Sequence, residues 1–176
     1  DDVVLAAFAR MKVVRDIEWH LIGHLQTNKV KLIAPFVRMI QSVDSLRLLQ
    51  EVDKQALKSN RTIDCLLQFH IAQEETKFGL DETEARELLG SDAFRQMQNI
   101  RICGVMGMAT FSDDEEQVRS EFRRLKTIFE NLKKEFFSEN PHFCEISMGM
   151  SGDWRIAVEE GSTMVRVGSL IFGERG

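Results

Sequence analysis

Near its C-terminus the chain reads Cys144-Glu-Ile-Ser-Met-Gly-Met-Ser-Gly-Asp-Trp154, followed by Glu160-Gly-Ser-Thr-Met-Val-Arg-Val-Gly-Ser-Leu-Ile-Phe-Gly173. Each stretch is a short apolar segment that runs into Ser and Gly residues, which predicts two strands separated by a helical turn. Small residues after strands let backbone N–H groups and hydroxyls approach an anion. We therefore expect a phosphate site at these residues, with tight turns that bind nothing as the alternative. The residues concerned are Ser147, Ser151, Gly152, Gly168 and Ser169.

Arg166 lies inside the second of these strands, two residues before Gly168. In that position its guanidinium can face into a sheet and bind a planar group. The alternative is a structural salt bridge, because a buried guanidinium needs a partner. The carboxylates in question are Asp153, Glu145 and Glu160.

The rest of the sequence alternates between apolar, strand-like runs and helical periodicity. We expect strands over residues 17–25, 39–43, 62–69 and 100–108, and helices over 5–14, 29–36 and 81–97. Asp44 is the expected N-cap of a further helix, and Asp81 with Glu84 forms a capping-box pattern. A long helix is expected from the apolar stripe Phe122, Leu125, Phe129, Leu132 and Phe136.

Strands that are apolar throughout are typical of parallel sheets buried on both faces, with helices in the crossovers. We therefore predict a single α/β domain over residues 1–176 with about six strands. A closed (β/α)₈ barrel has eight strands and about 250 residues. The pattern leaves two folds open, an open doubly wound sheet or a barrel from which an N-terminal piece is absent.

Two other residues are candidates for a binding site. His20 lies near the carboxyl end of a predicted strand, where α/β proteins bind ligands, although a hydrogen-bonded core histidine is the alternative. Met106 is expected in the core or in a pocket wall. The three cysteines are widely spaced in apolar runs, which favours buried, reduced thiols over disulfides or a metal site. They are Cys65, Cys103 and Cys144.

Composition excludes several classes of function. The net charge of −5 and the pI near 5.5 argue against nucleic acid as a partner. The apolar runs are too short to span a membrane, and the N-terminus lacks a basic signal-peptide region, so we expect a cytoplasmic protein. The sequence contains neither a nucleophile elbow nor a glycine-rich nucleotide motif.

Several motifs occur together and in order. They are Ile17-Glu-Trp-His-Leu-Ile-Gly-His-Leu-Gln-Thr-Asn-Lys29, Ser42-Val-Asp44, Gly104-Val-Met106, Ser147-Met-Gly-Met-Ser151 and Gly161-Ser-Thr-Met-Val-Arg-Val-Gly168 with Ile171-Phe-Gly173. Together they resemble the pyridoxal phosphate homeostasis protein family, the single-domain relatives of the alanine racemase N-terminal barrel. The resemblance implies a TIM-type (β/α)₈ barrel, here incomplete at the N-terminus with about six βα units, that binds pyridoxal 5′-phosphate (PLP).

The resemblance also implies roles for individual residues. Ser151, Gly168 and Ser169 would bind the phosphate, and Arg166 would face the pyridine nitrogen. A permanent cation there disfavours protonation of that nitrogen. We also count His20 and Met106 among the expected cofactor-binding residues.

The sequence departs from the family at its start. The family holds PLP through a lysine in an Ala-Val-Ser-Lys-like sequence after the first strand, and a Gly-Glu-Asn motif follows the second; both are absent here. Residues 5–16 align with the helix after the second strand, so neither Lys12 nor Lys29 takes the lysine's role. We expect the natural protein to have the missing strands. For this chain we expect a site that is empty or binds phosphate or sulfate.

The resemblance implies a protein that binds PLP and delivers it to PLP-dependent apoenzymes, without catalytic turnover. A PLP-dependent amino acid racemase is the alternative, although racemisation needs acid/base groups on both faces of the cofactor and, in related enzymes, a second domain with a tyrosine. The chain contains no tyrosine. A barrel for another phosphorylated metabolite remains a third hypothesis. As partners we expect PLP but neither nucleic acid nor membrane, and the protein as a monomer or weak homo-oligomer.

Overall fold

The structure is a computed structural model that describes residues 17–73 and 78–173. The expected helix over residues 5–14 lies outside these. The strands are β1 (His20–Leu21), β2 (Met39–Val43), β3 (Ile63–Phe69), β4 (Ile100–Gly107), β5 (Glu145–Met150) and β6 (Met164–Arg166). The helices are η1 (Thr27–Lys29), α2 (Val30–Ile33), α3 (Leu46–Lys58), α4 (Glu82–Gly90), α5 (Asp92–Arg95), α6 (Glu115–Phe136), α7 (Trp154–Glu159) and α8 (Ser169–Phe172).

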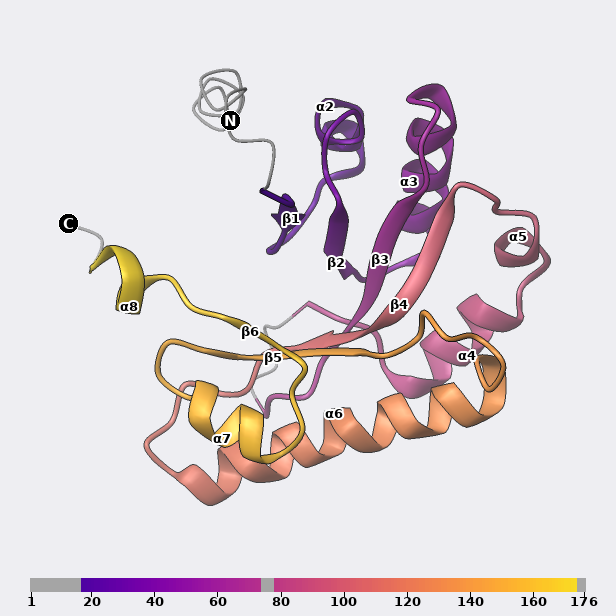
Figure 1. Cartoon of the computed structure of the whole chain (residues 1–176). Helices are drawn as coiled ribbons and strands as arrows, with labels where there is room; N and C mark the ends of the chain where they lie inside the picture. Colours follow the sequence, from indigo (N-terminus) through magenta and orange to yellow (C-terminus); the bar gives the residue numbers. More distant parts are fainter. Residues whose placement is uncertain (1–16, 74–77, 174–176) are drawn as a thin grey trace.

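The described strands form one parallel sheet in the order β1-β2-β3-β4-β5-β6. Each strand therefore pairs with its neighbour in sequence, and the strand order never reverses. A doubly wound sheet has such a reversal, at which its ligand binds. The sheet instead curves into part of a barrel wall, with β1 and β6 at its two edges (Figure 1). The prediction of an incomplete barrel is confirmed.

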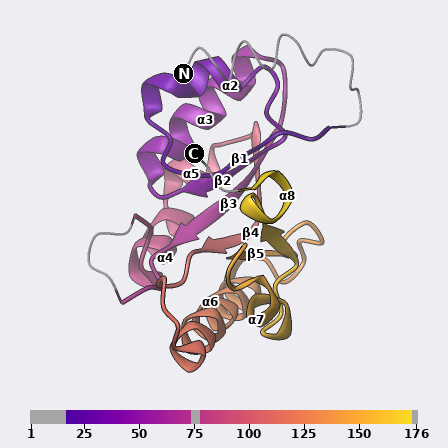
Figure 2. The same cartoon turned by 90° about the vertical axis from the view of Figure 1, so that its left-hand side faces the viewer.

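The longer helices cover one face of the sheet because they carry apolar stripes. Helix α3 buries Leu48, Leu49, Val52 and Ala56, and α6 buries a longer stripe that includes Phe122 and Leu125. Together with alternate strand residues these side chains form one large core. Figure 2 shows α2 to α6 on this outer side and α8 apart from them. A smaller cluster lies on the opposite, inner face of the sheet: Met39, Leu66, Cys103 and Met106.

Three predicted elements are shorter than expected. The helix over 29–36 is reduced to α2, Val30–Ile33. The strand over 17–25 is reduced to His20–Leu21, because the chain turns away at Gly23, whose φ is +93°. The helix over 81–97 is interrupted at Ser91, which has an extended ψ of 148°. The Ser91 hydroxyl donates to the Leu88 carbonyl at 2.7 Å and accepts from the Phe94 N–H at 3.1 Å. One serine therefore ends α4 and starts α5.

The capping predictions had mixed outcomes. The capping box of Asp81 and Glu84 is present. The prediction of Asp44 as N-cap of α3 is wrong, because Ser45 accepts the Leu48 N–H. The Asp44 carboxylate accepts from the Ser45 hydroxyl instead and lies 3.6 Å from His24. Among the described helices, none is both long and apolar enough to cross a membrane.

Candidate functional site

Arg166 occupies the end of the edge strand β6, and its guanidinium faces the inner side of the sheet. Its Nη1 donates to the Ser147 hydroxyl at 2.8 Å, and its Nη2 donates to the Gly107 carbonyl at 3.0 Å. Both acceptors are uncharged. Burial lowers the pKa of Arg166 to about 10, an effect that the nearby Asp153 carboxylate opposes. The side chain is therefore a cation at neutral pH in a partly dehydrated place.

The salt bridge considered for Arg166 is not what the structure contains. Among the described residues, no carboxylate forms an ion pair with its guanidinium. Glu160 pairs instead with Arg119 and Arg123 of α6, each at 3.0 Å. Arg166 therefore has no carboxylate in direct contact within the described part of the chain, and Asp153 acts on its charge only from a distance, which favours an anionic or electron-rich ligand.

His20 lies at the opposite edge of the sheet and is linked to Arg166 through two buried polar side chains. Its Nδ1 is 3.0 Å from Gln41 Nε2. Gln41 Oε1 accepts from the Ser147 hydroxyl at 2.6 Å, and Ser147 accepts from Arg166. Burial lowers the pKa of His20, against an opposing effect of Glu18. His20 is therefore held neutral on the inner face.

The expected phosphate-binding residues meet at the carboxyl ends of β5 and β6. The pairing register sets Met150 beside Arg166, so the residues after both strands lie next to one another. The Ser151 hydroxyl accepts the Gly168 N–H at 3.2 Å, and Ser169 begins α8. A Cβ added at Gly168 or at Gly152 would meet no atom within 4 Å. Open space therefore borders this loop.

Ser147 does not belong to this loop. It is fully buried inside β5, where its hydroxyl is used by Gln41 and Arg166. The expectation that it binds phosphate is therefore wrong, because it lies several residues before the end of the strand. Met106 is 1% exposed and belongs to the inner cluster, in the core as expected.

Gln41 is the residue that the sequence analysis missed. It lies in the middle of β2 and is 2% exposed. Its amide contacts His20 of β1 on one side and Ser147 of β5 on the other. A glutamine within the apolar run Met39–Val43 was a usable signal, since a buried amide needs partners. Its partners come from β1, β5 and β6, so sequence spacing could not identify them.

The cysteine prediction is partly wrong. Cys65 and Cys103 are buried thiols, as expected, but Cys144 is exposed. It directly precedes β5, and its backbone N–H donates to the Cys103 carbonyl of β4 at 2.9 Å.

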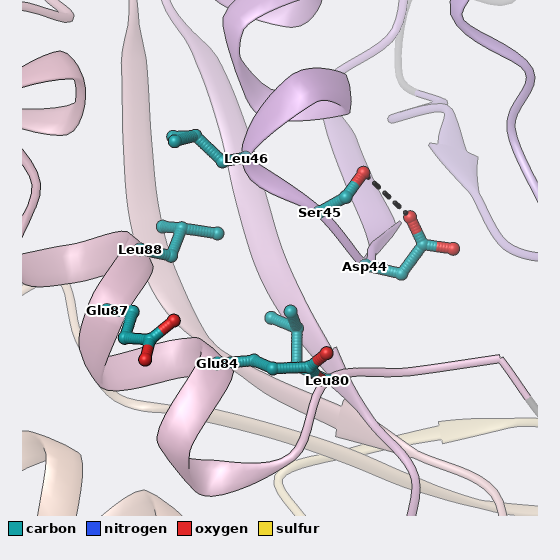
Figure 3. Close-up of a pocket in the computed structure, with 7 residues that line it drawn as sticks. All are labelled: Asp44, Ser45, Leu46, Leu80, Glu84, Glu87 and Leu88. Atoms are coloured by element: carbon teal, nitrogen blue, oxygen red, sulfur yellow. Dashed lines mark hydrogen bonds between the residues drawn. The ribbon is translucent and has the colours of Figure 1, made fainter.

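A separate pocket of about 270 Å³ lies between the start of α3 and helix α4 (Figure 3). Its charged lining consists of Asp44, Glu84 and Glu87, with leucines between them. Three carboxylates repel a phosphate. The phosphate site and this pocket are therefore different places.

A curved parallel sheet with helices outside, and with a basic and hydroxyl-rich inner end, defines a barrel of the alanine racemase type. The family described as alanine racemase, N-terminal domain, matches residues 6–176. The pyridoxal phosphate homeostasis protein of Aquifex aeolicus is 40% identical over 160 residues, which are 91% of this chain and 68% of that protein. The protein of the same name from Escherichia coli K12 is 32% identical, over 92% of this chain and 67% of its own length. The chain belongs to the pyridoxal phosphate homeostasis protein family.

Solved structures agree with this assignment. PipY of Synechococcus elongatus with PLP bound is 32% identical, with a TM-score of 0.85 over 96% of this chain and 76% of that chain. The same protein without PLP gives a TM-score of 0.88. Alanine racemase of Clostridium difficile is 13% identical with a TM-score of 0.71, a likeness of fold alone. The chain spans about two thirds of the length of the curated relatives.

The described residues fit PLP at two points. The first is the Arg166 guanidinium, which is in direct contact with no described carboxylate and can donate to an unprotonated ring nitrogen. The second is the loop of Ser151, Gly168 and Ser169, where hydroxyls border open space large enough for added atoms.

Proposed function

We propose that this protein binds PLP in vitamin B6 and amino-acid homeostasis and hands it to PLP-dependent apoenzymes without turning over a substrate. The observation that carries the proposal is the environment of Arg166. Its guanidinium is a largely buried cation with two uncharged hydrogen-bond partners, and it lies just before the loop that contains Gly168 and Ser169. A ligand with a planar ring and a phosphate fits both features. The names of the relatives, and the PLP bound to PipY, support the same ligand.

Each residue has a defined task in this proposal. The hydroxyls of Ser151 and Ser169 donate hydrogen bonds to the phosphate, and Gly168 leaves room for it. Arg166 donates to the ring nitrogen and disfavours its protonation. Met106 and the inner cluster provide an apolar floor. Bound PLP supplies an aldehyde that reacts with amines.

The absence of turnover is also part of the proposal. Racemisation needs an acid/base group on each side of the cofactor. The described side chains linked to Arg166 by hydrogen bonds across the inner face are the hydroxyl of Ser147, the amide of Gln41 and the neutral His20. The sequence provides no tyrosine for the second side. We also propose that the protein acts in the cytoplasm.

PLP titration of the full-length protein tests the ligand. Arg166→Gln is expected to weaken PLP binding about tenfold or more, because a hydrogen bond to a charged group is lost. Arg47→Gln is the control, since Arg47 is exposed on α3. Unchanged affinity in Arg166→Gln would contradict the assigned role, and no PLP binding by the wild type would end the proposal.

The phosphate end is tested with glycine variants. Gly168→Ala adds a methyl group to the open space and is expected to weaken PLP and inorganic phosphate binding together. Gly90→Ala, at the end of α4, adds a methyl group to equally open space away from the site. Equal affinities in the two variants would place the phosphate elsewhere.

Turnover and delivery need their own assay. The PLP-loaded protein is expected to reactivate a PLP-dependent apoenzyme while showing no racemisation of alanine or other amino acids. Measurable racemase turnover in that preparation would favour the enzyme hypothesis. Reactivation abolished by a trap for free PLP would show release into solution instead of direct transfer.

A further inference from the structure

Four side chains form a continuous hydrogen-bonded chain across the inner face. His20 of β1 contacts Gln41 of β2, Gln41 contacts Ser147 of β5, and Ser147 contacts Arg166 of β6. The three distances are 3.0, 2.6 and 2.8 Å. Because β1 and β6 are the two edges of the sheet, the chain connects both edges through its interior. Gln41 and Ser147 are 2% and 0% exposed.

Each of these three hydrogen bonds has a defined donor and acceptor. Arginine only donates, so the Ser147 oxygen accepts from Arg166 and its own proton goes to Gln41 Oε1. The Gln41 NH₂ group is then left to donate to His20 Nδ1. His20 Nδ1 must accordingly be unprotonated, and the ring proton resides on Nε2.

The opposite orientation of the Gln41 amide is disfavoured by a further contact. Gln41 Nε2 lies 3.0 Å from the sulfur of Met164. A thioether has no proton to donate, so an amide oxygen in that place would meet lone pairs. Met164 therefore fixes the direction of the amide, and through it the tautomer of His20.

We propose that Gln41 and Ser147 are positioning residues, which hold the Arg166 guanidinium in place for the ligand ring and hold His20 as its neutral Nε2–H tautomer. The proposal rests on the proposed function for the identity of the ligand. The tautomer of His20, however, is a property of the protein without any ligand. Two polar residues buried in a sheet interior are otherwise costly, since an apolar pair would fill the same space without needing partners. Their placement is explained if they orient the groups at the two ends.

Direct observation of the histidine nitrogens tests the proposal without any variant. Long-range ¹H–¹⁵N correlation spectra of the full-length protein without PLP are expected to show His20 protonated at Nε2 and not at Nδ1. Protonation at Nδ1 would overturn the proposal. This readout does not involve PLP, so its failure is distinct from failure of the proposed function, which is shown by absence of PLP binding in the wild type.

Variants then test the coupling. Ser147→Ala breaks the chain while removing a single oxygen, and it is expected to weaken PLP binding about tenfold because the guanidinium loses its orientation. Gln41→Glu places a carboxylate beside His20 and is expected to raise the midpoint of His20 titration. The matched control is Gln68→Glu, because Gln68 is buried in β3 but donates to the Phe78 carbonyl and is not part of the chain.

The combination of outcomes decides the matter. If the midpoint of the His20 titration were unchanged in Gln41→Glu, or changed equally in Gln68→Glu, Gln41 would have no specific contact with His20. Full PLP affinity in a folded Ser147→Ala protein would show that Arg166 needs no support from Ser147. Should either variant fail to fold, the tautomer of His20 in the wild type still decides the proposal.

Discussion

At the scale of single residues, Gly104 shows how closely two strands approach. Its φ is +155°, and an added Cβ would lie 1.8 Å from the Glu145 carbonyl oxygen in β5. Neither the strand nor the carbonyl can move without breaking the pairing of Gly104 with Glu145. We expect Gly104→Ala to lower the free energy of unfolding by about 3 kcal/mol, measured by urea denaturation. Gly90→Ala is the control, and a loss equal to that of Gly104→Ala would refute this explanation.

The three thiols should differ sharply in reactivity. Burial raises the pKa of Cys65, and burial raises the pKa of Cys103 to about 11, so neither forms a thiolate readily at neutral pH. Cys144 is exposed. Brief alkylation followed by peptide mass spectrometry is expected to modify Cys144 alone in the folded protein and all three in denaturant. Modification of Cys65 in the native state would contradict the burial.

Residue type and strand position were enough to predict that Arg166 faces into the sheet and that Gly168 lies near Ser151. They were not enough to predict the partners of Arg166, because Ser147 and Gly107 come from two other strands. The carboxylates that seemed close in sequence are used elsewhere, as Glu160 is by α6. Contacts between distant strands depend on register, which a single sequence does not reveal.

At the scale of elements, Glu121 of α6 holds two loops at the carboxyl ends of the strands. Its carboxylate accepts from the Thr110 N–H at 2.6 Å, from the Thr110 hydroxyl at 2.8 Å and from the Gln73 N–H at 3.3 Å. The residue is only 5% exposed, so water cannot easily replace it. We expect Glu121→Ala to cost about 2 kcal/mol and to speed amide exchange at Thr110 and Gln73.

The matched control for this prediction is Glu130→Ala, on the exposed face of the same helix. It changes the same charge and the same helix propensity but leaves the loops untouched. Faster exchange throughout the protein in Glu121→Ala, instead of at the two loops, would indicate a general loss of stability and not a local anchor.

Helix positions were largely predictable, whereas helix ends were not. The apolar stripe of α6 and the capping box of α4 are local patterns, and both are present. The cap of α3 is Ser45 and not Asp44, whose carboxylate accepts from the Ser45 hydroxyl and lies 3.6 Å from His24. Both residue types suit an N-cap, so residue type alone could not decide between two neighbours.

At the scale of the whole molecule, the alternation of strands and helices predicted a parallel sheet but not the order of its strands. Right-handed crossovers allow strands to be added at one edge or at both, and the observed order runs from β1 to β6 without a reversal. Periodicity could not distinguish a barrel from a doubly wound sheet, because both alternate strands and helices. The motifs between Ile17 and Gly168 made that distinction together, since they resemble a family whose barrel is known.

The free energy of unfolding should decrease as the pH falls below neutral, because of His20. Burial lowers the pKa of His20, while Glu18, Asp64 and Glu145 raise it and Arg38 lowers it further. The unfolded state takes up a proton near the ordinary histidine value of about 6.5, which the folded state resists. This contribution to stability is complete above that value and is lost as the pH falls from it toward the lowered pKa of the folded protein.

We therefore expect the free energy of unfolding of the wild type to decline between neutral pH and about pH 5, measured by urea denaturation at each pH. His20→Gln removes the titrating ring and is expected to make this decline shallower. His142→Gln is the control, since His142 is exposed on the loop before β5. A decline equally steep in His20→Gln and the wild type would mean that His20 takes up its proton as easily in the folded sheet as in the unfolded chain.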